Sequence, residues 1–298
     1  MSDAPVIESQ GLSKRYGDFT AVSDIALRVE RERITGFLGR NGAGKSSTIK
    51  MLLGMIRPSS GSARVLGHHI DVPAESLVMR RKVAYVGEDK GLYPYMTVGQ
   101  MIRFTRSFYP DWRTEVETRL LDEYQLPLAR GVRALSKGMR TKLALLLALS
   151  RRPELLILDE PTEGLDPVSI EELLQTLVRR SAEGTAIFFS SHQLHDVERI
   201  ADDVVMIDRG RIVLDTSLET VRADYRAISL GFSAEVDPER FALPGVDRVR
   251  VQGRHAIVYA SSNVDAIVRS AQSLGAVSVD VAPLTLREIF LDRVQADS

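Results

Sequence analysis

Eight residues near the start of the sequence have the spacing of a loop that binds phosphate. They read GRNGAGKS, from Gly39 to Ser46, and fit the pattern G-x-x-x-x-G-K-[ST]. Glycines let consecutive backbone N–H groups turn toward phosphate oxygens, and the first turn of a following helix adds partial positive charge. The pattern predicts that Lys45 contacts the β- and γ-phosphates of a nucleotide and that Ser46 binds a magnesium ion. The alternative is a chance glycine-rich turn.

The residues around the loop supply the context that this mechanism requires. A strand is expected to end at Leu38, and the apolar spacing of AGKSSTIKMLLGMI predicts a helix after the loop. Arg40 is expected to face outward. The candidate nucleotide-binding residues of the segment are Gly39, Arg40, Asn41, Gly42, Ala43, Gly44, Lys45, Ser46 and Ser47.

Two adjacent carboxylates end a second apolar segment. LLILDEP, residues 155–161, places four apolar residues before Asp159 and Glu160, which predicts a buried strand. A buried parallel strand delivers its carboxyl end to the same crevice as the phosphate loop. Asp159 is then expected to hold magnesium through its water shell, and Glu160 to orient or deprotonate the attacking water. Solvated acids at a strand end are the structural alternative.

A second helix start lies between these two motifs. In LSKGM, residues 135–139, Ser136 is well suited to be the N-cap of the helix that follows. Such an N-terminus also offers N–H groups and a hydroxyl to a γ-phosphate. Because the phosphate loop already fills that role within one chain, the extra site makes sense if it serves the nucleotide of another subunit.

Composition limits the classes of protein and partner. The 298 residues are 44% hydrophobic and 27% charged, which suits one large domain with its own core and a smaller second one. With 39 basic and 40 acidic residues, no bulk field attracts nucleic acid or an acidic lipid surface. The absence of cysteine excludes disulfides and thiolate metal sites. The apolar run Leu143 to Leu149 is far shorter than the roughly 20 residues of a membrane-spanning helix, so membrane association is expected to need a partner.

Apolar periodicity predicts the elements that position the motifs. Alternation over residues 6–38 indicates strands of an antiparallel or mixed sheet, and residues 89–149 read as a helical insertion. ELLILDE and TAIFFSS read as buried strands in a parallel crossover, joined by a helix over residues 167–184. A hairpin is expected to turn at Arg209 and Gly210.

The character of the sequence changes after about Thr216. A short helical link leads to further strands, the helical segment NVDAIVRSAQSLG and a last helix, TLREIFLDRV. This order predicts a small α+β domain of roughly 70 residues, near the lower limit of autonomous stability. No motif in it indicates chemistry.

The motifs stand in an order that resembles a known family over residues 6 to about 220. Tyr16 in SKRYGDFTAV is followed by GRNGAGKS, VAYVGEDKGLYPYMTV, LSKGM, LLILDEP, EGLDP and SSH, as in the ATPase subunits of ATP-binding-cassette (ABC) transporters. The resemblance implies an α/β fold, namely a P-loop cassette with a mixed-sheet core and a helical subdomain, followed by the small C-terminal α+β domain. The implied domains are a nucleotide-binding domain at 1–219, with its helical subdomain at about 89–150, and an accessory domain at 220–298.

The resemblance also implies roles for single residues. Two subunits are expected to sandwich two ATP molecules with Mg²⁺, each between the phosphate loop of one subunit and the LSKGM turn of the other, so that Ser136 and Gly138 act in trans. Tyr16 matches the aromatic residue that stacks on adenine, and His192 the histidine that contacts the γ-phosphate and positions the attacking water. Ordinary structural roles at strand ends are the alternatives for both. Asp166 matches the loop where the subunits touch, and it also suits a helix N-terminal turn.

Three residues depart from the family pattern. The family usually has glycine where Lys137 stands, and glutamine where Met139 and Glu88 stand. Lys137 either adds a cation near the incoming γ-phosphate or points to solvent. Glu88 is still expected to coordinate magnesium, although it adds negative charge at the site. The other motif residues are present, so a working ATPase is expected; a subunit that binds ATP without hydrolysing it rests only on these departures.

The implied partners are a second ABC ATPase subunit, identical or a close paralogue, and an integral-membrane permease that holds the protein at the cytoplasmic face of the cell membrane. The single cassette, the small C-terminal domain and the TLREIFLDRV end resemble the multidrug, antibiotic or polymer export branch of the family more than nutrient import. Tyr93, Tyr95 and Met96 either line a groove for a permease helix or pack onto their own subdomain. The rival class is a soluble ATP-dependent switch without a permease, and the neutral net charge argues against nucleic acid as a partner.

Overall fold

A six-stranded sheet lies at the buried centre of the first part of the chain. The computed structural model describes residues 4–296 of the 298-residue chain, which divides into two units, Met1–Asp215 and Thr216–Ser298. In the first unit this sheet has the strand order β10-β9-β3-β8-β7-β6. Its strands are β3 (Ile34–Leu38), β6 (Val83–Val86), β7 (Leu155–Asp159), β8 (Ala186–Ser191), β9 (Asp203–Asp208) and β10 (Arg211–Ser217).

The central strands of this sheet are parallel and fully buried. β3 pairs in parallel with β8 and β9, and β7 pairs in parallel with β6 and β8. Every residue of β3, β7 and β8 is buried, as expected for strands that are covered on both faces. The prediction of two buried parallel strands is confirmed. Their carboxyl ends open on one edge of the sheet, where ligands of such sheets bind.

A second, antiparallel sheet packs with it in a common core. Its order is β2-β1-β4-β5, formed by β1 (Ile7–Tyr16), β2 (Phe19–Val29), β4 (Ser60–Val65) and β5 (His68–His69). β1 and β2 alternate buried and exposed residues over much of their length, because only one face of this sheet meets the core. The strands predicted over residues 6–38 are confirmed, and β3 belongs to the other sheet because its residues are apolar or small on both faces.

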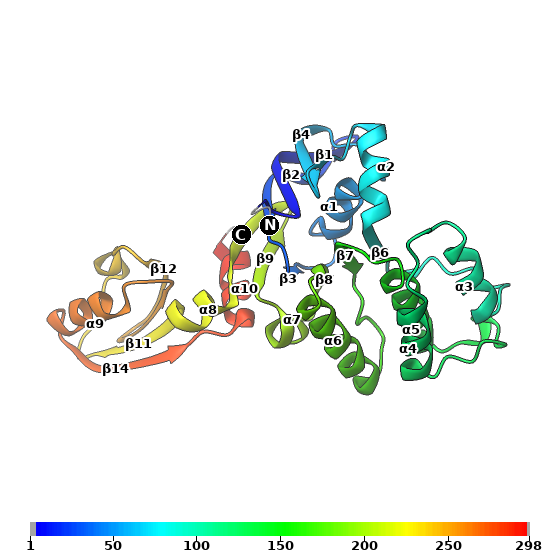
Figure 1. Cartoon of the computed structure of the whole chain (residues 1–298). Coiled ribbons are helices and arrows are strands. Elements are labelled where there is room, and N and C mark those ends of the chain that lie inside the picture. The colour runs from blue at the N-terminus through cyan, green and yellow to red at the C-terminus, as the bar shows by residue number, and fades with distance from the viewer. Residues whose placement is uncertain (1–3, 297–298) are drawn as a thin grey trace. The chain divides into compact units, whose positions relative to one another are not determined.

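Helices surround the two sheets. They are α1 (Lys45–Leu52), α2 (Pro73–Lys82), α3 (Val98–Arg106), α4 (Thr114–Tyr124), the 3-10 turn η1 (Val132–Ala134), α5 (Lys137–Leu149), α6 (Pro167–Ala182) and α7 (Leu194–Ile200). Figure 1 shows α3, α4 and α5 as a group beside the sheets, which confirms the predicted helical insertion. Periodicity predicts no element over residues 58–88, where β4, β5, α2 and β6 lie, because these elements are short or weakly patterned.

The hairpin between β9 and β10 reaches the loop that follows β3. Arg209 and Gly210 both have positive φ, 45° and 79°, as the two central residues of a tight hairpin turn require. The backbone N–H of Gly210 donates to the carbonyl of Ala43 at 2.9 Å. The predicted turn is therefore confirmed, and it also holds the glycine-rich loop from one side.

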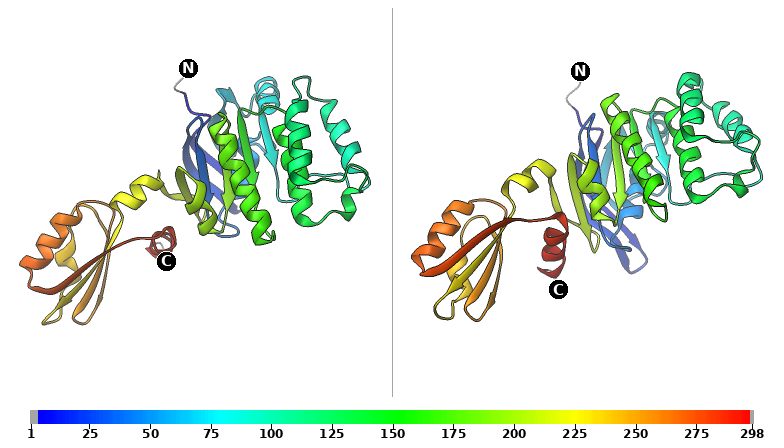
Figure 2. Two further views of the ribbon diagram at one scale, coloured as in Figure 1. Left: turned by 60° about the horizontal axis from the view of Figure 1, so that its bottom comes forward. Right: turned by 90° about the horizontal axis from the view of Figure 1, so that it is seen from below.

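The second unit is a four-stranded antiparallel sheet covered by one helix. Its order is β12-β13-β11-β14, and Figure 2 shows α9 along one face of it. Ile228, Leu230 and Val258 from the sheet pack with Ile267 and Ala271 from α9. The elements are α8 (Leu218–Asp224), β11 (Arg226–Phe232), η2 (Pro238–Phe241), β12 (Val246–Gln252), β13 (His255–Ala260), α9 (Val264–Ser273), β14 (Ala276–Pro283) and α10 (Leu286–Ala296).

The core of the second unit can be tested separately from that of the first unit. Phe241 is fully buried, with its ring centroid 6.1 Å from that of Phe232. We expect Phe241→Ala to lower the free energy of unfolding of this unit by about 3–5 kcal/mol, because it leaves a cavity in a small core. Hydrogen exchange should show faster exchange of the β11 amides and unchanged exchange in β3. Val277→Ala on β14, where the side chain is exposed, serves as the control; equal acceleration in both units would contradict separate cores.

Candidate functional site

The glycine-rich loop joins the end of β3 to the start of α1. Gly42 and Gly44 have positive φ angles of 82° and 112°. Residues with a side chain rarely adopt this backbone conformation. A Cβ at Gly39 would lie 2.6 Å from the Ile207 carbonyl, and one at Gly44 would lie 2.6 Å from the Ala21 carbonyl. These positions therefore require glycine. α1 starts without a side-chain cap and without an acidic residue in its first turn, so its N–H groups remain available to an anion.

Lys45 lies under this loop in a buried position. Its ammonium donates to the carbonyls of Gly39 at 2.7 Å and Arg40 at 3.2 Å. It also lies 3.1 Å from Glu160 Oε1, and both side chains are more than nine-tenths buried. The angle of that contact is not that of a hydrogen bond, so Oε1 has no hydrogen-bond donor among the described residues. The oxygen is therefore paired by charge alone.

A network across the ends of β7 and β8 holds the two acids. Asp159 and Ser190 are paired in the parallel register, and the Ser190 hydroxyl donates to Asp159 Oδ1 at 2.6 Å. The same hydroxyl accepts the backbone N–H of Glu160 at 3.0 Å. Glu160 itself has a φ of 48°, a left-handed conformation that is uncommon for a non-glycine residue. This backbone conformation, fixed by its neighbours, directs the side chain of Glu160 away from the strand direction.

Glu160 Oε2 meets the residue that follows β8. The Nδ1 atom of His192 lies 2.9 Å from this oxygen, and the backbone N–H of His192 donates to it at 3.3 Å. One carboxylate therefore contacts Lys45 through one oxygen and His192 through the other. The three residues come from α1, the end of β7 and the end of β8, as the sequence patterns predicted for the edge of a parallel sheet.

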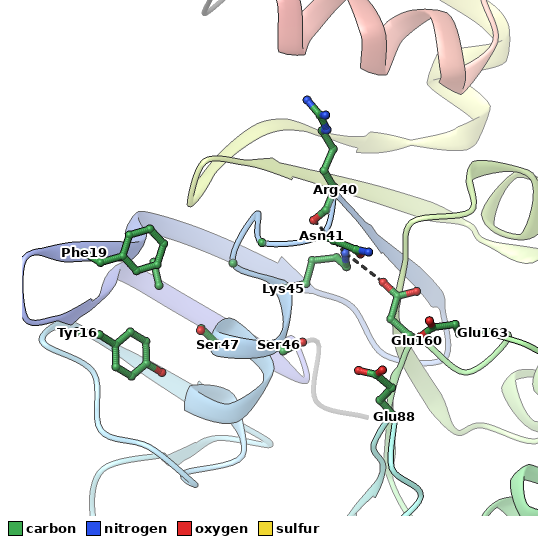
Figure 3. Close-up of a pocket in the computed structure, with 13 residues that line it drawn as sticks. Tyr16, Phe19, Arg40, Asn41, Lys45, Ser46, Ser47, Glu88, Glu160 and Glu163 are labelled. Carbon is green, nitrogen blue, oxygen red and sulfur yellow. Dashed lines mark hydrogen bonds and ion pairs between the residues drawn. The ribbon is translucent and has the colours of Figure 1, made fainter.

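A cavity of about 390 Å³ opens beside this cluster. Figure 3 shows Lys45 reaching toward Glu160, with Ser46 and Glu88 on the side below and the side chain of Arg40 directed away from Lys45. The lining residues are Tyr16, Phe19, Ala21, Arg40, Asn41, Gly42, Gly44, Lys45, Ser46, Ser47, Glu88, Glu160 and Glu163. Of these, Phe19, Ala21 and Glu163 were not among the residues predicted from the sequence.

Two aromatic side chains form one end of the cavity. Tyr16 and Phe19 are cross-strand partners of β1 and β2 on either side of a two-residue turn, and their exposed fractions are 48% and 63%. The ammonium of Lys14 lies 5.2 Å from the centroid of the Tyr16 ring and donates to the Arg57 carbonyl at 2.6 Å. Exposed rings in a cavity offer flat faces to a planar base. The sequence RYGDF could have identified Phe19, because a two-residue turn places the residues on either side of it opposite each other.

Burial, and then nearby charge, shifts the pKa of two residues close to Glu88 in the chain. The pKa of Tyr85 is raised to about 12, mainly by burial and then by the nearby charges of Asp159, Asp89 and Glu88. The pKa of Lys90 is lowered, first by burial and then by the charge of Lys137. The loop after β6 therefore lies within electrostatic reach of both the acids after β7 and the LSKGM turn.

Ser136, Gly138 and Asp166 do not line this cavity. Ser136 is the N-cap of α5 and accepts the N–H of Met139 at 3.2 Å. Asp166 is the N-cap of α6 and accepts the N–H groups of Val168 and Ser169 at 3.1 and 3.0 Å. The hydroxyl of Ser169 is the main cause of the lowered pKa of Asp166. Within one chain, the structure thus places these three residues at helix starts away from the phosphate loop.

The remaining predicted residues lie at the back of the site. Gly39, Ala43, Asp159 and His192 do not line the cavity. Gly39, Ala43 and His192 each form a hydrogen bond with a residue that does, whereas Asp159 is linked to Glu160 through the hydroxyl of Ser190. Among residues 4–296, no helix combines the length and the apolar character that crossing a bilayer requires.

Comparison with known proteins gives one consistent family. The family model described as ABC transporter matches residues 22–163. The Nod factor export ATP-binding protein I of Rhizobium etli is 33% identical over 298 residues, covering 96% of this chain and 92% of the relative. The bacitracin transport ATP-binding protein BcrA of Bacillus licheniformis is 34% identical over 211 residues, covering 70% and 68%.

A solved structure, described as the ATP binding subunit of an ABC transporter, superimposes with a TM-score of 0.67 at 33% identity and covers 73% of this chain and 92% of its own. The α/β cassette fold predicted from the sequence is confirmed by this likeness. A phosphate loop next to paired acids, on a chain that matches such relatives over most of its length, leaves one conclusion. The chain belongs to the family of ABC transporter ATP-binding proteins, which bind and hydrolyse ATP.

Proposed function

We propose that two copies of this subunit, or one copy and a close paralogue, sandwich two ATP·Mg²⁺ complexes and that the resulting motion drives a separate membrane permease, in the direction of export. The observation that carries the proposal is the contact of Glu160 with both Lys45 and His192 beside the glycine-rich loop. The nucleotide-binding domain is residues 1–219, with its helical subdomain at about 89–150, and residues 220–298 form an accessory domain.

The chain offers suitable groups for the nucleotide. We assign the loop of residues 39–47, with the Ser46 and Ser47 hydroxyls, to the phosphates. The rings of Tyr16 and Phe19, at the other end of the cavity, are assigned to the base. The ammonium of Lys45 is held by carbonyl oxygens and Glu160, and it exchanges these contacts for phosphate oxygens when the nucleotide binds. This exchange frees Glu160 Oε1 for a water molecule.

A magnesium ion fits the oxygen atoms that the site presents. Ser46 and Glu88 line the cavity, and Asp159 lies behind it with one oxygen bound by Ser190. Magnesium is usually bound by one or two carboxylates, waters and substrate phosphates, so this set suits it without a closed protein cage. When bound, the ion neutralises charge on the β- and γ-phosphates.

Hydrolysis then depends on positioning of one water molecule. Glu160 orients this water molecule or accepts a proton from it. The contact of His192 with Oε2 keeps the Glu160 carboxylate directed into the cavity. Ser136 and Gly138 lie outside the cavity of their own chain, and we assign them to the γ-phosphate of the partner subunit. Asp166 lies in the same region and is assigned to the contact between subunits.

The permease surface is assigned to an exposed row of aromatic rings. Tyr95 contacts Tyr93, Tyr93 contacts Phe104 and Phe104 contacts Phe108, with ring centroids 5.1 to 5.6 Å apart. All four rings are exposed, and Tyr95 reaches 76%. An exposed apolar row of this kind suits an interface with another protein. The Nod factor export relative supports the direction of export, and we assign the subunit to the cytoplasmic face of a membrane, held there by the proposed permease.

Glu160→Gln tests the assigned chemistry. We expect ATP hydrolysis to fall by about 100-fold or more, because the amide cannot accept a proton, while ATP still binds. Turnover is measured by phosphate release, and binding by equilibrium dialysis. Glu115→Gln, which alters an exposed carboxylate at the start of α4, should retain wild-type turnover. Residual turnover within a few-fold of wild type would remove Glu160 from the mechanism.

Tyr16→Ala and Phe19→Ala test the assignment of the base. Each should weaken ATP binding by about 1–3 kcal/mol, because stacking of an aromatic ring on a base is lost. Binding of inorganic triphosphate, which has no base, should be unchanged and provides the control. If both ligands weaken equally, the rings act on the loop structure and not on the base.

The aromatic row is tested in the cell that produces the protein. We expect the Tyr95→Ser, Phe108→Ser variant to leave the membrane fraction for the soluble fraction, since its exposed apolar contact area is reduced. Purified variant and wild type should bind ATP equally, which shows that the cassette is intact. Val178→Ser on α6, also an exposed apolar residue, is the matched control. Retention of the double variant in the membrane fraction would place the docking surface elsewhere.

A further inference from the structure

The sheet of the second unit has one apolar edge strand whose outer side is unpaired. β14 is the last strand in the order β12-β13-β11-β14, and among the described residues it pairs with β11 alone (Figure 1). Its sequence, AVSVDVAP, contains one charged residue, Asp280. Val277 and Val281 are 72% and 42% exposed. Natural sheets usually protect such an edge with charges or with a covering segment, because its free N–H and C=O groups can pair with another chain.

The opposite edge of the same sheet has this protection. β12 has the sequence VDRVRVQ, in which three of seven residues are charged. Its start is also tied to α10. The guanidinium of Arg248 donates to the carbonyl and to Oδ1 of Asp292 at 3.3 and 3.1 Å, and Arg293 donates to Asp247 at 3.0 Å. Only the β14 edge of this domain is therefore both apolar and free to accept a strand in the part of the chain that the structure describes.

The ladder between β11 and β14 shows which groups point to the free edge. Successive residues of an antiparallel strand bond alternately to the neighbour on one side and on the other. The N–H of Leu284 donates to the carbonyl of Tyr225 at 3.1 Å, so in this register the even-numbered residues of β14 bond to β11. Val279 and Val281 then direct their N–H and C=O groups outward. These groups have no hydrogen-bond partner among the described residues.

The β14 strand of a second copy fits this edge in an antiparallel pairing with a two-fold axis at Val279. Val279 then lies opposite Val279 of the second copy, and the two residues exchange N–H···O=C bonds because both point outward. Val281 lies beside Val277 of the second copy, where the ladder with β11 is irregular, and their exposed apolar side chains meet. Asp280 lies opposite Ser278, so no like charges face each other.

The neighbouring registers are less favourable. An axis at Asp280 places the two Asp280 carboxylates directly opposite each other, and like charges in a cross-strand pair are destabilising. An axis at Val281 places Pro283 opposite Val279, and proline has no N–H to donate. Hydrogen bonding and charge therefore select the same register.

We propose that β14 joins two copies of this chain edge to edge, so that their accessory domains share one continuous antiparallel sheet. The two-fold axis is perpendicular to the sheet, which leaves both α9 helices on the same face. The contact uses no residue of the nucleotide site, so it holds two subunits together without ATP. A subunit that is already tethered in this way meets its partner's cassette at a high effective concentration when nucleotide binds.

The association is tested on the full-length protein without nucleotide, by sedimentation over a series of concentrations. Wild type should form a dimer. Val281→Lys should raise the dissociation constant by about 10-fold or more, because an ammonium enters an apolar contact. Ile257→Lys is the matched control: Ile257 is 37% exposed on β13, an inner strand, and this variant should dimerise as wild type does. A monomeric wild type, or equal weakening by both variants, overturns the proposal.

The register is tested by single cysteines, since the chain has none of its own. The Cα atoms of a hydrogen-bonded antiparallel pair lie about 5.5 Å apart. This separation lies within the range of about 4.4–6.8 Å that a disulfide spans. Mild oxidation without nucleotide should link Val279→Cys into a covalent dimer and leave Asp280→Cys and Val281→Cys unlinked. Linkage of Asp280→Cys or Val281→Cys instead overturns the register, and linkage of none of the three overturns the edge contact.

These measurements are independent of the function proposed above. Because they use nucleotide-free protein, a chain that fails to hydrolyse ATP still gives a valid result for the edge contact. A monomeric wild type that hydrolyses ATP contradicts the edge contact alone.

Discussion

The arrangement of the site depends on the buried ion pair of Lys45 and Glu160, because both charges need partners from the surrounding structure. A charge removed from water is strongly destabilising unless an opposite charge and hydrogen bonds satisfy it. Lys45 finds two loop carbonyls and one carboxylate oxygen, and Glu160 finds the ammonium and His192. The pair is therefore stable only if β3, β7 and β8 end at the same edge. A small shift of any of these strands would leave one buried charge without a partner.

The parallel sheet meets this demand through its register. Asp159 lies opposite Ser190, so one hydroxyl binds both the Asp159 carboxylate and the N–H of Glu160. The left-handed conformation of Glu160 is an uncommon backbone state, and it persists because these contacts fix the residues on either side. Uncommon backbone conformations of this kind often occur at functional sites. Here the conformation gives the Glu160 side chain a direction that it would not have in a regular strand.

The two charged departures from the family pattern lie in different surroundings. Glu88 brings a third carboxylate to the cavity wall, and Lys137 brings a cation to the neighbouring turn. Gly164 leaves room for that cation to lie across the loop, and Gly138 lets the turn approach Ser169. Both glycines thus permit close packing between the start of α5 and the segment that leads into α6.

The sequence by itself determined the phosphate loop, the two acids after a buried strand, the helical insertion and the fold class, because each is set by residues that lie close together in the chain. A glycine pattern, an apolar run and a helical periodicity are local signals, and the structure confirms the elements that they predict. The roles of single residues at the site stay predictions. The local pattern RYGDF pairs Phe19 with Tyr16, but only the tertiary structure decided that both rings face the cavity, that Glu163 joins its wall and that Lys137 lies on Gly164. Those contacts depend on strand pairing and on loops 27 residues apart packing against each other, and no local pattern fixes the direction of a side chain across such a distance.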